Sequence, residues 1–253
     1  MMDWHGLPTP TDIGFGTEWA RTEHEDALDA WCDLDAPRIV TIGRTGAERE
    51  ACLPAHYEPG YRYPLIVWLQ SPDRAGRMET WLPRISERNA VSVAVEGPVL
   101  SPGGMGHRRW SGEASAVAAA ARRIDEAVAA ACEEFSIHSE RVYLAGAGTA
   151  GAMALSVGMT SPQTFAGVAA IDPGPVQLLL LLRDFRRMRG RRACLAAVER
   201  APSPHATIEL ADLLETAGVE LEHVDAHAAD DPHRRAASAL NAWMMRHITA
   251  AAA

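Results

Sequence analysis

Lysine is absent from this sequence, and all 24 of its Lys/Arg positions are arginines. The absence excludes a Schiff base to pyridoxal phosphate, the lysine of a Walker-A loop and a serine–lysine dyad. The chain is not basic as a whole either, because its formal charge is −9. Affinity for nucleic acid grows with the number of cations that meet phosphates, so we expect no nucleic-acid partner.

Cysteine is scarce, and so are long apolar runs. The four cysteines, at positions 32, 52, 132 and 194, form no Cys-x-x-Cys pair. They therefore predict reduced thiols with neither a zinc site nor a redox motif, and we expect no cofactor. No stretch reaches the roughly 20 apolar residues that span a bilayer, and residues 1–5 do not resemble a signal peptide. We expect a cytoplasmic protein with no membrane contact.

Apolar runs of four to eight residues alternate with segments of helical periodicity. This alternation predicts an α/β protein with a mostly parallel sheet of about eight strands and helices on both faces. The strong strand candidates are residues 65–69, 91–95, 142–145, 167–171 and 193–198, and the weaker ones are 38–42, 49–53 and 219–225. A chain of this length fits an irregular lead-in over residues 1–36 and a single domain over residues 37–253.

Helical spacing of apolar residues is clearest in three segments. Residues 78–85 and 117–135 each repeat apolar side chains at three- and four-residue intervals, as one face of an amphipathic helix does. The same spacing recurs before the C-terminus, where Pro232 suits the first turn of a closing helix.

The most informative stretch is residues 140–155, Glu-Arg-Val-Tyr-Leu-Ala-Gly-Ala-Gly-Thr-Ala-Gly-Ala-Met-Ala-Leu. It resembles the phospholipase/carboxylesterase and polyhydroxybutyrate-depolymerase-like branch of the α/β-hydrolases. In that branch a strand ending in Arg-Val-Tyr-Leu-Ala-Gly leads into a Gly-x-Ser-x-Gly turn and a helix. The resemblance extends from about residue 38 to about residue 248. It implies an α/β-hydrolase fold and an esterase-like site.

The resemblance places a glycine where the family has its nucleophile. Aligning Gly146 with the first motif glycine puts Gly148 at the serine position, while Ala150 replaces the second motif glycine. Acyl transfer through residue 148 cannot occur without an oxygen. Glycine nevertheless suits the strained turn, because it reaches positive φ without steric cost.

The other positions that the resemblance assigns to catalysis also depart from the family pattern. Gln70 and Ser71 stand where the family has a His-Gly pair that contributes to the oxyanion hole. The loop 199–204 supplies no aspartate for the acid, and the histidine slot falls near Asp230, between His227 and His233. Because nucleophile, acid and oxyanion positions all differ, we expect Ser-His-Asp catalysis to be lost.

Further residues are candidates for this site, and several of them have a structural alternative. Thr149 is a substitute hydroxyl or an ordinary first helical residue, and Asp172 is an acid or the start of an Asp-Pro-Gly turn. His233 is a candidate for a residual catalytic base with Asp230 and Asp231 as its partners, and Asp231 is equally a candidate helix N-cap. Trp110 and Gly146 are candidate ligand contacts within the region of resemblance.

Three hypotheses about function follow. The first is a pseudo-hydrolase that keeps the scaffold to bind a small ester-like ligand or a protein. The second is an active ester hydrolase with a non-standard site. The third is a dinucleotide-binding protein, because Gly146-x-Gly148-x-x-Gly151 also fits a pyrophosphate-binding turn and Asp172 follows where a ribose-binding acid is expected.

A possible interaction surface lies in residues 176–192, where five consecutive leucines precede a cluster of arginines. Five adjacent leucines cannot all face one side of a helix, so some must be exposed or covered by another molecule. The segment therefore predicts either a helix packed on the sheet and followed by an arginine-rich turn, or a contact surface. Self-association or an acidic protein partner would cover such a surface.

Overall fold

The computed structural model describes residues 36–45, 47–71, 76–100, 108–111, 113–161, 165–199 and 204–250. The chain divides after Asp35 into two units, and the unit formed by residues 36–253 holds every element named below. The irregular lead-in predicted for residues 1–36 lies almost wholly outside the described residues. The predicted single domain over the remainder stays a prediction.

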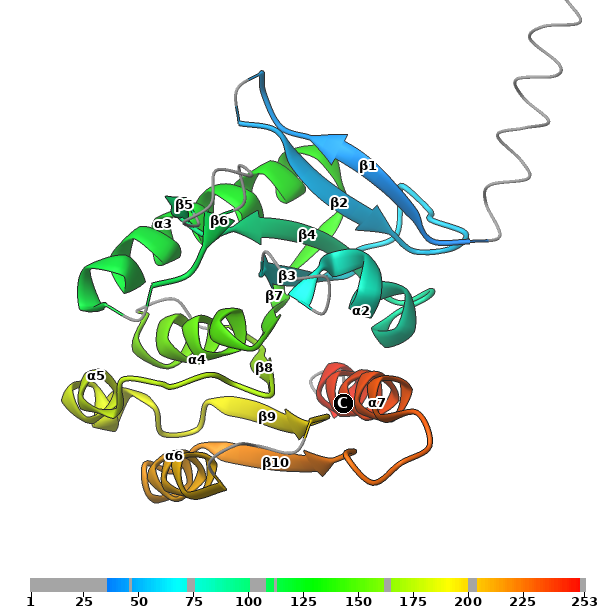
Figure 1. Cartoon of the computed structure of the whole chain (residues 1–253). Coiled ribbons are helices and arrows are strands. Elements are labelled where there is room, and N and C mark those ends of the chain that lie inside the picture. The colour runs from blue at the N-terminus through cyan, green and yellow to red at the C-terminus, as the bar shows by residue number, and fades with distance from the viewer. Residues whose placement is uncertain are drawn as a thin grey trace, which may run out of the picture. The chain divides into compact units, whose positions relative to one another are not determined.

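Eight strands form one sheet in the order β1-β2-β4-β3-β7-β8-β9-β10 (Figure 1). Their bounds are Arg38–Ile42 (β1), Arg49–Leu53 (β2), Tyr63–Gln70 (β3), Val91–Glu96 (β4), Ile137–Ala147 (β7), Gly167–Ile171 (β8), Arg192–Ala197 (β9) and Glu220–Asp225 (β10). β1 pairs antiparallel with β2 and β2 antiparallel with β4, while all other neighbours in the sheet are parallel. The predicted mostly parallel sheet of about eight strands is confirmed.

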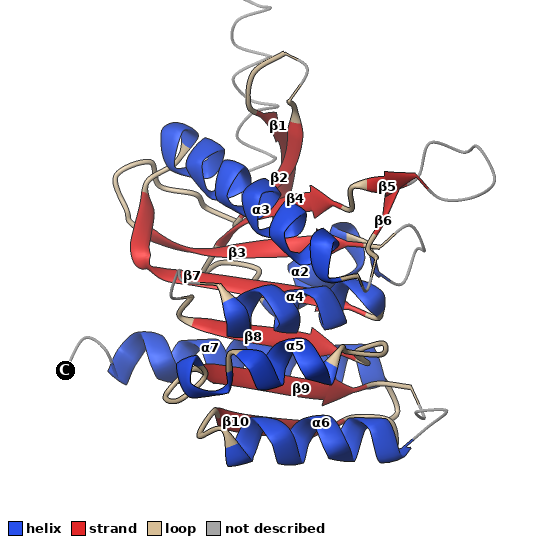
Figure 2. Cartoon of the chain, turned by 90° about the vertical axis from the view of Figure 1, so that its left-hand side faces the viewer, coloured by secondary structure: helices blue, strands red, loops and turns tan. Residues whose placement is uncertain are grey.

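Helices cover both faces of the sheet. Their bounds are Met78–Ile85 (α2), Ala114–Glu134 (α3), Thr149–Thr160 (α4), Leu178–Arg183 (α5), Pro204–Thr216 (α6) and Pro232–Ala250 (α7), and a single 3-10 turn, η2, spans Phe185–Arg187. Figure 2 shows α3, α4, α5 and α6 on the face toward the viewer, with α7 behind the strands. Helices on both faces, as the sequence predicted, leave the parallel strands buried on each side.

The strands alternate their side chains between two apolar cores. Leu65, Val67 and Leu69 of β3 belong to the larger core under α3, α4, α5 and α6. Ile66 and Trp68 point to the smaller core under α2 and α7, because successive residues of a strand face opposite sides. The Trp68 indole N–H donates to the carbonyl of Gly76 at 2.9 Å, so its polar group is satisfied in the core.

The structure differs from the predicted elements in two respects. β7 begins at Ile137, five residues before the predicted strand, because residues 137–141 are mostly polar and only partly buried, so they lack the apolar run that marks the rest of the strand. A separate ladder of two-residue strands, β5 (Val99–Leu100) and β6 (Arg108–Arg109), was not predicted, since pairs this short leave no periodicity to recognise. None of the helices within the described residues is long and apolar enough to cross a membrane.

Candidate functional site

A sharp turn joins β7 to α4 at Gly148, which has φ 59° and ψ −128°. Its N–H donates to the carbonyl of Ile171 at 2.9 Å, at the end of the neighbouring strand β8. The Gly148 carbonyl accepts from the N–H groups of Ala152 at 3.1 Å and Gly174 at 2.9 Å. These bonds hold the turn against both α4 and the segment after β8, so its backbone conformation is set from two sides.

The glycines around this turn differ in what surrounds them. A Cβ on Gly146 would lie 2.8 Å from the backbone carbon of Ala150, and one on Gly151 would lie 2.9 Å from the Gly146 carbonyl oxygen. Both glycines are therefore required for the close packing of β7 against α4. A Cβ on Gly148 would meet no atom within 4 Å, so the turn leaves open space for a side chain that glycine does not provide.

The end of β3 lies beside the turn and is held by hydrogen bonds. The Ser71 hydroxyl donates to the carbonyl of Ala147 at 3.2 Å, and the Ser71 N–H donates to the carbonyl of Gly76 at 3.3 Å. The Trp110 indole N–H donates to the Gln70 carbonyl at 2.8 Å, and the Gln70 amide donates to the Glu50 carboxylate at 3.1 Å. Gln70 and Ser71 thus lie next to the Gly148 turn. The Ser71 hydroxyl and N–H and the Gln70 amide and carbonyl already have hydrogen-bond partners within the protein.

Asp172 follows β8 directly and adopts a positive φ of 42°. Its carboxylate accepts from the N–H groups of Val198 at 2.9 Å and Glu199 at 3.0 Å, just after β9. Burial raises the pKa of Asp172, while these two donors and, more weakly, the nearby His233 lower it. Asp172 therefore ties two strand ends together and also lies within electrostatic reach of a histidine.

His233 is the second residue of α7, and its half-buried ring lies 5.2 Å, centroid to centroid, from the ring of Trp81 in α2. Neither the Trp81 contact nor the approach to Asp172 was predicted, because α2 and α7 are far apart in sequence. His227 is exposed and pairs with Asp225.

Asp230 is exposed, and Asp231 accepts from the Arg234 N–H at 3.0 Å as a helix N-cap does. Of the two candidate histidines, His233 is the one within electrostatic reach of Asp172, the residue that follows β8.

Comparison with solved structures identifies the architecture. No family model matches the sequence, and no curated protein matches it. An esterase from Thermogutta terrifontis, a thermophilic planctomycete, was solved with butyrate bound and aligns with a TM-score of 0.58 at 15% identity, covering 85% of this chain and 95% of its own. An S-formylglutathione hydrolase from Staphylococcus aureus aligns with a TM-score of 0.58 at 12% identity, covering 82% of this chain and 96% of its own. This chain has the α/β-hydrolase fold.

A longer protein shares the same fold. A candidate dipeptidyl aminopeptidase IV from Bacteroides ovatus aligns with a TM-score of 0.56 at 13% identity over 85% of this chain, which spans 36% of that protein's length. Identities of this size show the α/β-hydrolase fold alone.

In an α/β-hydrolase the strand-to-helix turn presents a nucleophile, and the residue after it offers its backbone N–H to an oxyanion. Here Gly148 forms that turn and Thr149 begins α4 with an exposed side chain. The arrangement can present N–H groups at the positive end of a helix, but residue 148 has no atom that could attack a carbonyl. Within the described residues, no group of three His, Cys, Asp or Glu side chains could hold a metal ion.

Proposed function

We propose that this protein uses the α/β-hydrolase fold to bind a small ester-like or carboxylate ligand beside Gly148 without forming an acyl-enzyme. The observation that carries the proposal is the turn itself. Gly148 adopts a conformation that costs other residues about 1–3 kcal/mol, faces open space, and supplies no oxygen there. The backbone conformation is that of a nucleophile turn, but residue 148 has no side-chain oxygen to act as the nucleophile.

The groups around the turn support binding rather than acyl transfer. The Ser71 hydroxyl is bound to the Ala147 carbonyl, and the Ser71 N–H is bound to the Gly76 carbonyl. The next residue is Pro72, which has no N–H to offer an oxyanion. The Asp172 carboxylate is bound to two backbone N–H groups. Residue 148 therefore has no nucleophilic oxygen, and the oxyanion candidate Ser71 and the candidate acid Asp172 are engaged in structural hydrogen bonds.

The ligand class follows from the start of α4. The first N–H groups of a helix lack partners inside the helix and favour an anion or a carbonyl oxygen. A short carboxylate would place its oxygens there and its alkyl chain in the space that a side chain at 148 would fill. Butyrate, which the esterase from Thermogutta terrifontis was solved with, is a suitable probe.

A second candidate is hydrolysis by activated water. His233 lies within electrostatic reach of Asp172, and a histidine in an active site can act as a general base, but no hydrogen bond or ion pair joins the two side chains among the described residues. Dinucleotide binding stays a prediction from the sequence. The packing of β7 on α4 already accounts for Gly146 and Gly151, so the glycine spacing needs no nucleotide to explain it.

Labelling with a fluorophosphonate and turnover of p-nitrophenyl butyrate test the absence of acyl transfer. We expect no stoichiometric label and no hydrolysis above buffer, in the wild type and in Gly148→Ser alike, because the acid and oxyanion positions are also altered. Gly60→Ser is the matched control, since a Cβ on Gly60 also meets no atom within 4 Å and its φ is ordinary. Labelling of the wild type would refute the proposal.

Calorimetric titration with butyrate tests the binding part. Gly148→Asn fills the open space with a side chain, so it should weaken binding by about tenfold or more. Gly60→Asn should leave the affinity unchanged. Equal affinities in all three proteins, or no binding to the wild type, would show that the ligand does not lie beside Gly148.

A further inference from the structure

The leucine run of residues 178–182 is distributed over several environments. Leu181 is fully buried, whereas Leu179 is 81% exposed and Leu182 is 50% exposed. Residues three apart on a helix lie on the same side, so these two leucines form one apolar strip on the outside of α5. Few other large apolar side chains of the described residues are as exposed, and the strip directly precedes the arginine cluster.

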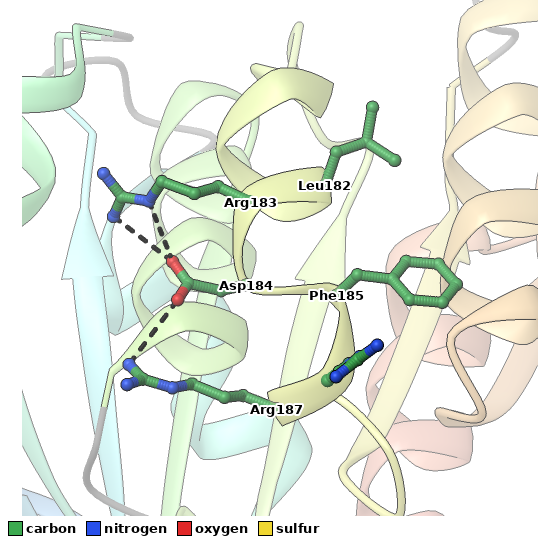
Figure 3. Close-up of a pocket in the computed structure, with 6 residues that line it drawn as sticks. Leu182, Arg183, Asp184, Phe185 and Arg187 are labelled. Carbon is green, nitrogen blue, oxygen red and sulfur yellow. Dashed lines mark hydrogen bonds and ion pairs between the residues drawn. The ribbon is translucent and has the colours of Figure 1, made fainter.

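A pocket opens at the junction of α5 and η2, lined by residues 182–187 (Figure 3). Asp184 is one of the lining residues; it accepts from Arg183 at 3.2 Å, and its other oxygen lies 3.5 Å from an Arg187 nitrogen. Figure 3 shows these three side chains on one side of the chain, while Leu182 and Phe185 point to the other. The junction therefore presents an ionic side and, facing the opposite way, an apolar side.

The arginines of residues 183–192 have different roles. Arg191 donates to the carbonyls of Ser161 at 2.7 Å and Arg187 at 2.9 Å, so it anchors the segment to the end of α4. Arg192 pairs with Glu220 at 2.9 Å. Arg186 and Arg189 are exposed, and no carboxylate among the described residues pairs with either. Two guanidinium groups are thus left for another molecule.

The charge of this segment contrasts with that of the rest of the chain. Residues 183–192 hold six arginines and one aspartate, a net charge of +5. The remaining 243 residues hold 18 arginines and 32 acids, a net charge of −14. A local cationic surface on an anionic protein attracts an anionic partner of limited extent, because charges beyond roughly 8 Å are screened at physiological salt.

We propose that Leu179, Leu182, Arg183, Arg186, Arg187 and Arg189, here called the arginine–leucine surface, bind an acidic polypeptide segment that carries apolar side chains. Carboxylates of the segment pair with the free guanidinium groups, and its apolar side chains cover the leucine strip and Phe185. Nucleic acid and anionic membranes fit less well, because both would bring extended negative charge against a protein of net charge −9. The proposal is independent of the ligand at Gly148.

The test uses a short fluorescein-labelled peptide of alternating Glu-Glu-Leu-Leu blocks and a second peptide with alanine in place of leucine. Binding to the full chain is measured by fluorescence anisotropy. Arg186→Glu/Arg189→Glu and Leu179→Ser/Leu182→Ser should each weaken binding of the leucine peptide about tenfold. Arg38→Glu/Arg122→Glu is the matched control with the same change of charge at two exposed arginines, and it should bind the peptide nearly as well as the wild type.

Several outcomes would overturn the proposal. One is failure of the leucine peptide to bind, another is equal binding of the alanine peptide, and a third is equal weakening by the control variant. Tighter binding to phosphatidylglycerol vesicles or to a DNA duplex would assign the surface to a lipid or a nucleic acid instead. Self-association in sedimentation velocity that only the Arg186→Glu/Arg189→Glu variant loses would assign it to a second copy of the chain. Unchanged circular dichroism of each variant shows that the fold is retained.

Discussion

The Gly148 turn and the arginine–leucine surface are opposites in what they leave unsatisfied. At the turn, the Gly148 N–H and carbonyl both have hydrogen-bond partners, and the missing element is a side chain. At the surface, Leu179 and Leu182 are exposed to solvent. No carboxylate among the described residues pairs with Arg186 or Arg189. The turn lacks a side chain at residue 148, whereas the surface carries exposed side chains on a short helix.

This difference shows what constrains each region. The turn cannot change without disturbing β7, β8 and α4, because its hydrogen bonds and its glycines join all three. Substitutions at the surface should change the free energy of unfolding little, because α5 is only six residues long. Between residues 178 and 188, only Leu181 and Met188 are fully buried. Substitutions at the turn should therefore alter stability, and substitutions at the surface should alter binding.

The largest expected effect is at Gly146. In Gly146→Ala the new methyl group would lie 2.8 Å from the Ala150 backbone, so β7 and α4 must move apart. We expect a loss of about 3 kcal/mol in the free energy of unfolding, the upper end for overpacking, measured by urea denaturation. Gly190→Ala is the counterpart next to the arginine–leucine surface. It meets no atom within 4 Å and should cost only about 1 kcal/mol, for its φ of 74°. Equal losses would break the comparison.

The next effect is at Asp172. Asp172→Ala leaves the Val198 and Glu199 N–H groups without their acceptor, so we expect a loss of about 2 kcal/mol in the free energy of unfolding. Asp172→Asn keeps one acceptor and should cost about 1 kcal/mol at neutral pH. A thermal melt of each variant beside the wild type measures the difference.

The pH dependence of Asp172 sharpens the same prediction. Burial raises the pKa of this carboxyl in the folded protein above its unfolded value of about 3.9. A raised pKa stabilises the fold below the unfolded pKa, and this contribution is lost as the pH rises through the folded pKa. Asp172→Asn should therefore be more destabilising at about pH 4 than at neutral pH. The opposite trend would mean that the backbone donors outweigh burial.

The smallest effect is expected at Asp184. The Asp184 side chain is 13% exposed, but its partners Arg183 and Arg187 are 74% and 64% exposed, so water screens both ion pairs and they contribute little to stability. Asp184→Asn should lower the free energy of unfolding by no more than about 1 kcal/mol. The same variant frees two more guanidinium groups, so it should tighten binding of the acidic leucine peptide. A large loss of stability would show that the surface is as constrained as the turn.

Much of the candidate site could be predicted from local sequence, and the rest could not. The motif around residue 148 predicts a strand, a turn and a helix, because period and glycine spacing are local properties. The partners of Asp172 and His233 lie on other elements, at Val198 and Trp81, and no spacing along the chain relates them. His227 and His233 were equal candidates in the sequence, since only the position of α7 separates their environments.

By itself, the sequence determined the strands of the eight-stranded sheet, the α2 helix and the glycine at the turn. Apolar periodicity and the conformational freedom of a glycine depend only on a few neighbouring residues. The tertiary structure decided which side chains meet. It bound Asp172 to the end of β9, brought His233 against Trp81, and limited α5 to a short helix whose leucines divide between core and solvent. The physical reason is that packing of parallel strands joins residues that are distant along the chain, whereas periodicity reports only on near neighbours.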